Sequence, residues 1–337
     1  MPQTFRLHRT GGIALTLSDR GATWLACEVP VGAQRRGVVL QRAGIEDASA
    51  DKAYLGATVG RYANRIGHAR IRLGMREWLL MPSPRSRHQL HGGPGGFHAC
   101  TWAAEQVDDF AIRFSLRSPD GDQGFPGELH AQVIYRLADA MTIEMETTAT
   151  VTAPSPVAIT NHAYFNLDGV SPDAGDVRDH RLRIAARHYM PVDSDLIASG
   201  RPGCVQGTSF DFRRAKRIGQ DWLADGQQAA GGGYDHAFLL DGQCAGLEQP
   251  AAELTSASGD LQLAISTTLP AMQFYAGQYL DSVASPAGQP YSACAGLALE
   301  PGYLPDSPNH PEWPQPSCWV MPGETWHHVT RYAFRAA

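Results

Sequence analysis

Apolar and polar residues alternate with a period of two along much of the chain. The stretches that follow this pattern are residues 13–17, 112–116, 129–137, 141–145 and 261–265. Successive side chains of a β-strand point to opposite faces, so the alternation predicts strands with one buried face and one polar face. Helical periodicity is rare, and its best candidate is a short helix around residues 212–223.

Turn-forming residues separate the predicted strands. Examples are Pro119-Asp120-Gly121-Asp122, Ser258-Gly259-Asp260 and Pro322-Gly323, which have the residue types that favour tight turns. Strands with one polar face are typical of antiparallel sheets, and no regular alternation of strands with helices indicates a parallel one. We therefore predict an all-β fold, a large antiparallel β-sandwich, with residues 1–337 as a single domain.

Charge and hydropathy exclude several classes of partner. The chain has 337 residues and a formal net charge of −6, whereas proteins that bind nucleic acid usually present a basic surface. It has no run of about 18 apolar residues that would predict a membrane-spanning helix. Residues 1–30 do not have the pattern of a signal peptide. We expect neither a nucleic-acid nor a membrane partner.

The cysteines carry no metal or disulfide signature. They are scattered, without a CxxC pair or metal-type spacing to a histidine, at Cys27, Cys100, Cys204, Cys244, Cys294 and Cys318. Free thiols are typical of a reducing compartment, so we expect a cytoplasmic protein.

Two loop-like segments concentrate polar groups in the first third of the chain. In one, Asn64 and Arg65 offer an amide and a planar guanidinium, which suit vicinal hydroxyls or a carboxylate; the alternative is an arginine that ties down a loop. The other is glycine-rich and contains His88 and His91. Its glycines permit either the close approach of a ligand or a tight loop. A metal site would need a third ligand, and none is adjacent.

Three further segments follow in the second half. Residues 160–169 crowd Asn, His, Tyr and Asp at the end of an apolar strand, and His162 and Tyr164 share one strand face. Asp235, next to His236, suits either a ligand contact or a turn. Glu300 follows an apolar run; it lies either at an exposed strand end, which residue-level reasoning slightly favours, or in a cleft with a raised pKa.

Seven segments together resemble the aldose 1-epimerase family, in the family's order between residues 60 and 314. They read GRYANRIGHARI, HQLHGGPGGF, DGDQGFPGEL, TNHAYFNLDG, YDHAFLL, LPAMQFYAGQYL and LALEPGYLPDSPNHPEWP. The sequence departs from the family just after Glu300. The family more often has a glutamine two positions after this glutamate, whereas here the next residues are Pro301-Gly302-Tyr303.

The resemblance implies a galactose-mutarotase-like β-sandwich with an open sugar cleft, no cofactor and no metal. It implies His162 as general acid and Glu300 as general base. By the same resemblance, the sugar-binding residues are Asn64, Arg65, His91, Tyr164, Asp235 and Gln273. Phe274, Tyr275 and Trp313 are candidates for an aromatic face against the sugar ring.

The implied reaction interconverts the α and β anomers of free hexoses such as D-galactose and D-glucose. One acid and one base suffice, and a protonated His162 would be favoured by nearby Asp235 or Glu300. The substrate is then a small aldose, and the protein is expected to be a monomer or homodimer. The alternatives are a hexose-6-phosphate mutarotase, a non-catalytic sugar-binding domain, and a metal-dependent isomerase or hydrolase.

Overall fold

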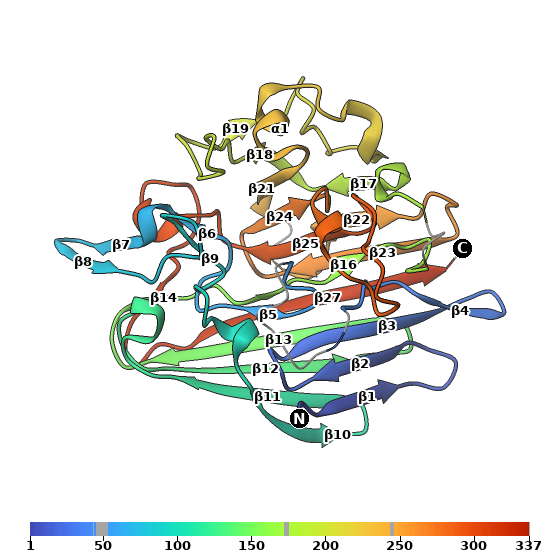
Figure 1. The fold of residues 1–337 in the computed structure, drawn as a ribbon, viewed down its shortest axis with the longest axis horizontal. Helices are drawn as coiled ribbons and strands as arrows, with labels where there is room; N and C mark the ends of the chain where they lie inside the picture. The colour runs from blue at the N-terminus through green and yellow to red at the C-terminus, as the bar shows by residue number, and fades with distance from the viewer. Residues whose placement is uncertain (43, 45–52, 172–174, 243–245, 337) are drawn as a thin grey trace.

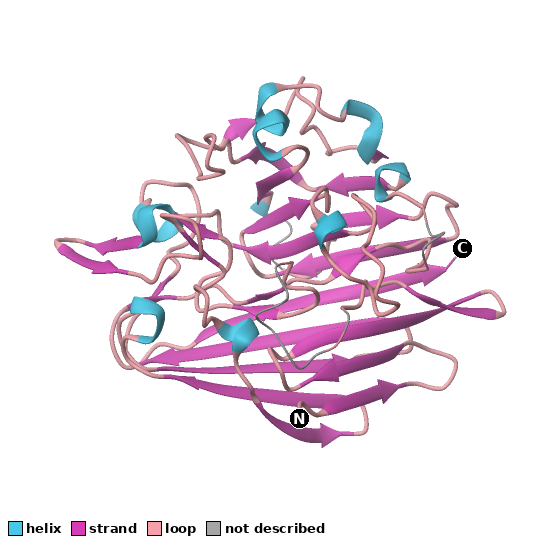
Figure 2. Ribbon diagram, in the orientation of Figure 1, coloured by secondary structure: helices cyan, strands magenta, loops and turns pink. Residues whose placement is uncertain are grey.

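The structure, a computed structural model, describes residues 1–42, 44, 53–171, 175–242 and 246–336. Strands and loops make up most of this part of the chain, with a few short helical turns between them (Figure 2). Every named strand pair is antiparallel, which confirms the predicted all-β fold. No helix among these residues is long and apolar enough to cross a membrane.

A nine-stranded sheet contains the longest strands of the molecule (Figure 1). In spatial order its strands are β10 (Ala103–Asp108), β11 (Ala111–Ser118), β12 (Leu129–Leu137), β13 (Thr142–Val151), β27 (Trp326–Ala336), β23 (Leu261–Thr267), β22 (Ala252–Thr255), β17 (Arg181–Ile184) and β20 (Lys216–Arg217). Strands β12 and β23 bury every second residue, so the alternation seen in the sequence is the alternation between core and opposite face.

Two further sheets complete the sandwich. The six-stranded sheet has the order β16 (Tyr164–Phe165), β25 (Leu297–Gly302), β24 (Ala271–Tyr275), β21 (Asp235–Leu240), β18 (Ala186–Tyr189) and β19 (Gly203–Cys204). The four-stranded sheet has the order β1 (Thr4–His8), β2 (Ala14–Ser18), β3 (Thr23–Val31) and β4 (Gln34–Gly37). One core cluster joins Trp24 of β3, Val133 of β12 and Leu299 of β25, so all three sheets bury apolar side chains together.

Short strand pairs shape the loops at the edge of the sheets. They are β5 (Thr58–Val59) with β15 (Thr160–Asn161), β6 (Arg65–Ile66) with β9 (Gln89–Leu90), β7 (Arg70–Leu73) with β8 (Arg76–Leu79), and β14 (Ser155–Pro156) with β26 (Trp319–Val320). Single 3-10 turns occur at η2 (Gly67–Ala69), η3 (Phe97–Ala99), η4 (Asp122–Gly124), η5 (Val177–Asp179), η8 (Leu280–Ser282) and η9 (Ser307–Asn309).

The helix predicted around residues 212–223 is wrong. Phe212 packs into an aromatic cluster against Tyr234 and Phe274, residues 216–217 pair as β20 with β17, and only η6 (Ile218–Asp221) is helical, as a 3-10 turn. Tertiary packing and strand pairing therefore override the local pattern. The described residues contain one α-helix, α1 (Gly226–Gly231), whose N-cap Asp225 accepts two backbone N–H groups.

Candidate active site

Strand register gathers one set of polar side chains on a single face of the six-stranded sheet. Directly opposed residues of an antiparallel pair point to the same face, as do residues two apart on one strand. The register of β16, β25, β24 and β21 produces two rows of opposed residues, Tyr164–Ala298–Tyr275–Asp235 and Glu300–Gln273. Polar side chains that are spread over more than 130 residues of sequence therefore lie on one surface.

Loops beside β6 and β9 supply the opposing side chains. Asn64 and His91 both have left-handed backbones, with φ of 67° and 51°. The His91 N–H donates to the Asn64 carbonyl at 3.1 Å, and the Asn64 N–H donates to His91 Nδ1 at 3.2 Å. The two residues fix each other, and Arg65 follows directly in β6.

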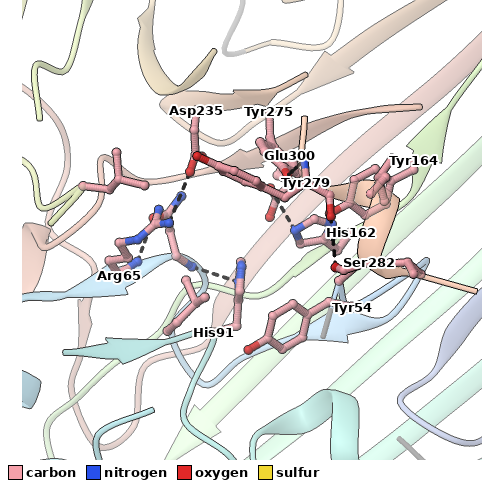
Figure 3. A pocket seen from close by; sticks show the side chains of 16 residues that line it. Tyr54, Arg65, His91, His162, Tyr164, Asp235, Tyr275, Tyr279, Ser282 and Glu300 are labelled. Carbon is pink, nitrogen blue, oxygen red and sulfur yellow. Dashed lines mark hydrogen bonds and ion pairs between the residues drawn. The ribbon is translucent and has the colours of Figure 1, made fainter. Parts of the chain in front are cut away.

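The two sets of side chains enclose a cavity of about 220 Å³. This is smaller than the roughly 300–1,000 Å³ of pockets that hold drug-sized ligands, and it suits a small polar molecule. Figure 3 shows Arg65 and Asp235 on one side of the pocket and His162 and Tyr164 on the other. The lining residues are Ala53, Tyr54, Asn64, Arg65, Leu90, His91, His162, Tyr164, Leu196, Asp235, Tyr275, Tyr279, Leu280, Ser282, Val283 and Glu300.

His162 and Glu300 form the central contact. His162 lies between β15 and β16, where its backbone N–H donates to Ala57 and its carbonyl accepts from Gly56, both at 2.9 Å. Its Nε2 lies 3.4 Å from Oε1 of Glu300, and both side chains are only 5% exposed. Glu300 lies inside β25, so the expectation of an exposed strand end is wrong: the sheet continues past it and the pocket covers it.

Burial shifts the pKa of both groups toward their neutral forms. The pKa of Glu300 rises to about 8, mainly through burial and secondarily through the charge of Asp235, while Arg65 opposes the shift. Burial lowers the pKa of His162 to about 4, and the charge of Asp235 only partly offsets this. Asp235 acts on His162 in the expected direction, but burial has the larger effect on its pKa. Both shifts favour the neutral forms, a protonated Glu300 and an unprotonated His162.

Arg65 and Asp235 close the other end of the pocket. Arg65 Nη2 lies 3.2 Å from Asp235 Oδ2, and Gln273 Nε2 donates to Asp235 Oδ1 at 2.6 Å. The Asp235 N–H donates to Nδ1 of His236, which is buried beside it. Arg65 and Asp235 line the cavity, whereas Gln273 lies behind Asp235 and holds its carboxylate. The arrangement offers guanidinium donors and a carboxylate acceptor to a polyhydroxylated ligand.

Among the described residues, His91, His162 and Glu300 come nearest to a metal-binding arrangement. Their potential ligand atoms lie within 4.8 Å of one another. His91 Nδ1, however, accepts the Asn64 N–H, so its own proton lies on Nε2 and neither nitrogen offers a free lone pair. Burial also lowers the pKa of His91 well below its usual value. The geometry makes His91 a neutral hydrogen-bond donor rather than a metal ligand.

A neighbouring arginine, Arg61, has the tethering role that was one alternative for Arg65. Its buried guanidinium donates to Ser118 Oγ and to the carbonyls of Ser118, Pro119, Pro126 and Gly127, over 2.6–3.2 Å. These acceptors belong to the DGDQGFPGEL segment and the residues just before it. That segment therefore supports the loop that carries Asn64 and Arg65 without lining the pocket.

The glycine-rich segment is a tight loop. At Gly92, where φ is 82°, a Cβ would lie 1.8 Å from the Gly60 carbonyl oxygen, so the close approach is to backbone. His88 lies outside the pocket lining, accepts the His68 N–H at Nδ1 and contacts Asp195 at 3.3 Å through Nε2. Of the segment's two histidines, only His91 lines the cavity.

Aromatic residues at the pocket differ in part from those suggested by the sequence. Tyr275 lines the cavity. Phe274 is buried against Tyr234, and Trp313 stacks on His310 with its Nε1 donating to the Gly200 carbonyl. Both of these residues serve packing rather than the pocket.

Reasoning from the sequence missed several lining residues, and three of them, Tyr54, Leu196 and Tyr279, have large side chains outside the strands. The Tyr54 ring lies between His91, at 4.6 Å, and His98, at 4.7 Å, measured between ring centroids. Tyr279 is 56% exposed at the cavity. None of the three belongs to a strand, so no periodic pattern in the sequence marks them. Their left-handed backbone or their exposure at the cavity is evident only in the folded chain.

Comparisons with known proteins show which family this chain is similar to. The family model described as aldose 1-epimerase matches residues 3–333. The chain is 46% identical to the aldose 1-epimerase of Escherichia coli, over 98% of this chain and 94% of that protein. It is 35% identical to the galactose mutarotase of Mus musculus, over 98% of this chain and 93% of that protein.

Structural similarity extends over the whole chain. An aldose epimerase homologue from C. elegans superposes with a TM-score of 0.89 at 28% sequence identity and covers 100% of both chains. The family match, the related sequences and this shared fold lead to one conclusion: the chain belongs to the aldose 1-epimerase family and is an enzyme of the isomerase class.

Proposed function

We propose that the enzyme interconverts the α and β anomers of free hexoses such as D-galactose and D-glucose, with His162 as general acid and Glu300 as general base. The observation that carries this proposal is the 3.4 Å contact between His162 Nε2 and Glu300 Oε1, buried in a cavity of monosaccharide size. The names of the related proteins, aldose 1-epimerase and galactose mutarotase, support the same substrate class.

The reaction begins with the opening of the sugar ring. The carboxylate of Glu300 takes the proton of the anomeric hydroxyl, the C1–O1 bond becomes a carbonyl, and the bond from C1 to the ring oxygen breaks. His162 donates its proton to that ring oxygen. Rotation about the C1–C2 bond presents the other carbonyl face, and closure reverses both transfers, so each residue returns to its starting state.

The proton must first lie on His162. Burial alone favours the opposite arrangement, a protonated Glu300 and a neutral His162. A bound sugar changes the balance, because its anomeric hydroxyl donates to the Glu300 carboxylate and stabilises the charged form. We propose that binding moves the shared proton across the His162–Glu300 contact and thereby prepares the acid and the base together.

The remaining predicted residues hold the sugar. Asn64, Arg65, His91 and Asp235 present donors and an acceptor to ring hydroxyls. Tyr164 lies beside His162, with 4.9 Å between ring centroids. Gln273 acts through Asp235, whose carboxylate it orients.

Phosphorylated hexoses are disfavoured by the charge around the cavity. Arg65 is the only lysine or arginine among the described lining residues, and its guanidinium is already paired with Asp235. A phosphate dianion prefers a cluster of unpaired basic groups. A free hexose therefore suits this pocket better than a hexose 6-phosphate.

Three coarser features accompany the proposal. We propose that residues 1–337 fold as one domain, which a core cluster extending from Leu7 to Phe334 supports. We propose a cytoplasmic location, because the scattered cysteines are of the free-thiol type; Cys244 lies outside the described residues, and the other five are free. The protein is proposed to act as a monomer or homodimer on a small aldose, without nucleic-acid or membrane partners.

Polarimetry tests the function directly. Freshly dissolved α-D-galactose and α-D-glucose change optical rotation slowly in buffer. A catalytic amount of the protein should accelerate each change without altering the final rotation of that sugar. No acceleration by folded protein, with either sugar, would overturn the proposed activity.

A further inference from the structure

Left-handed backbone conformations are concentrated at this pocket. Thirteen described residues other than glycine have positive φ, and four of them line the cavity: Tyr54, Asn64, His91 and Leu196, with φ of 57°, 67°, 51° and 60°. Such conformations are uncommon for residues with a side chain, especially bulky ones, and are retained where surrounding structure and function require them. Asn64 and His91 already have proposed roles at the sugar. Leu196 does not.

A rigid turn holds Leu196 in this conformation. The carboxylate of Asp193 accepts the N–H groups of Asp195 and Ile197 at 2.9 and 3.0 Å. The Leu196 N–H donates to the Asp193 carbonyl at 3.0 Å, and the Asp193 N–H donates to the Ile197 carbonyl at 2.9 Å. Four hydrogen bonds within five residues therefore define where the Leu196 side chain lies.

The same turn is attached to the loop that leads to His91. The carboxylate of Asp195 pairs with Arg87 Nη2 at 2.7 Å and contacts His88 Nε2 at 3.3 Å. The position of Leu196 is thus coupled to the loop that forms the opposite wall of the pocket.

The side chains of Leu196 and Asp235 both approach Gly231. A Cβ built on Gly231, at the end of α1, would be 3.6 Å from Leu196 Cδ2 and 3.6 Å from Asp235 Cβ. Leu196 is only partly buried and faces the cavity. It therefore places an apolar surface in the part of the pocket that also contains Asp235.

A pyranose presents C–H groups as well as hydroxyls, and the two need different neighbours. Arg65 and Asp235 can pair with hydroxyls at this end of the cavity, but neither matches the C–H groups between them. We infer that Leu196 is a substrate-contacting residue, which packs against the C–H groups of the sugar at the Arg65–Asp235 end and excludes water from that ion pair. This inference rests on the proposed function and adds a selectivity residue to it.

The test compares Leu196→Ala with a matched control. Leu223 also has a left-handed backbone, with φ of 54°, and is 49% exposed, but it does not line the cavity. Loss of a partly buried apolar contact should raise KM for D-galactose by roughly fivefold to tenfold. We expect Leu196→Ala to show this rise with little change in kcat, and Leu223→Ala to match the wild type, when anomer exchange is followed by NMR.

Two further substitutions separate contact with the sugar from support of the loop. Leu196→Met keeps apolar bulk and should retain a KM near that of the wild type. Leu196→Asn suits the left-handed backbone better than leucine but removes the apolar surface, so it should raise KM as Leu196→Ala does while remaining at least as resistant to heat. An Asn variant with normal KM would mean that only loop geometry matters and would overturn the inference.

The outcome is distinguishable from failure of the proposed activity. If the wild type does not accelerate anomer exchange, the proposed function fails. If the wild type is active and Leu196→Ala leaves KM unchanged, the function stands and the role of Leu196 is refuted.

Discussion

His162 and Glu300 meet through a single 3.4 Å contact, although 138 positions separate them in the sequence. Each is buried and each is shifted toward its neutral form. The two groups therefore form one buried unit, and we expect the loss of either one to disable both proton transfers.

The first prediction concerns removal of either member. Glu300→Gln cannot accept the anomeric proton, and His162→Asn cannot deliver one to the ring oxygen. Each change should lower kcat by about 10²–10⁴-fold, the usual cost of losing a general acid or base. The double variant should be little worse than either single one, because both transfers belong to one reaction. Polarimetry provides the rates, and circular dichroism confirms that each variant folds.

Arg65→Ala is the contrasting variant for this series. It removes a binding group and leaves the Asp235 carboxylate without its cation, so KM should rise as well. A folded Glu300→Gln protein with nearly normal kcat would refute the assignment of the base.

A second prediction is a plateau of activity between two pH limits. As pH rises through about 8, the pair loses its one proton and no acid remains. As pH falls through about 4, the pair gains a second proton and no base remains. The value of kcat/KM should fall on both sides, with apparent pKa values that belong to the pair. A profile that stays flat from neutrality to well above pH 8 would contradict this picture, provided that circular dichroism shows folded protein throughout.

The third prediction is independence from metal ions. The hydrogen bond from the Asn64 N–H to His91 Nδ1 removes one of the three groups that a metal would need. Activity should survive exhaustive dialysis against EDTA at the level of a sample dialysed without chelator. A large loss that a divalent ion restores would show that the cluster does bind a required metal.

A fourth prediction concerns phosphorylated substrates. Since Arg65 is engaged by Asp235, kcat/KM should be higher for D-glucose than for glucose 6-phosphate, on the order of tenfold or more, because a phosphate gains its affinity from charge-assisted bonds. The two sugars can be compared by NMR exchange under identical salt. A preference for the phosphate ester would assign the protein to the alternative activity.

The fifth prediction tests the support of the loop that carries Arg65. Arg61→Met would leave a buried hydroxyl and four carbonyls without their donor, which should cost about 3 kcal/mol or more in the free energy of unfolding. Arg117 is the matched control: its side chain is 65% exposed, so Arg117→Met should change stability by only about 0.5 kcal/mol. Urea unfolding measures both.

If Arg61→Met does not fold at all, Arg61→Lys provides the measurement, because it keeps the charge with fewer donors. Equal stability of the wild type and the Arg61 variants would show that the five hydrogen bonds contribute little.

The strands of the nine-stranded sheet could be predicted from the sequence because their signal is local. The predicted strand over residues 129–137 coincides with β12, and that over 261–265 lies within β23. In both, the pattern depends only on which face meets the core. The segment around Phe212 has no such pattern, since its apolar residues are buried by an aromatic cluster drawn from distant strands.

The residues of the candidate site could be named from the sequence, but their electrostatics could not. Family resemblance named His162 and Glu300, and the cavity brings them together. Burial of Glu300 depends on strand β24 and on loops far away in the sequence, so the residues beside it could not reveal it. Tyr54 and Leu196 were missed for the same reason: a left-handed loop residue carries no periodic signal, and only the folded backbone directs it to the pocket.

The cross-strand rows that contain Tyr164, Tyr275, Asp235, Gln273 and Glu300 also limit which insertions and deletions this enzyme can accept. Adding or deleting one residue within β24 would turn its side chains to the opposite face and remove two members of the set at once. The strand half of the pocket therefore cannot change in length without losing part of the site. The turn around Leu196 has no strand register to keep, but its four hydrogen bonds also fix its length. Randomised libraries for new sugar preferences therefore belong at position 196 itself, as substitutions rather than insertions.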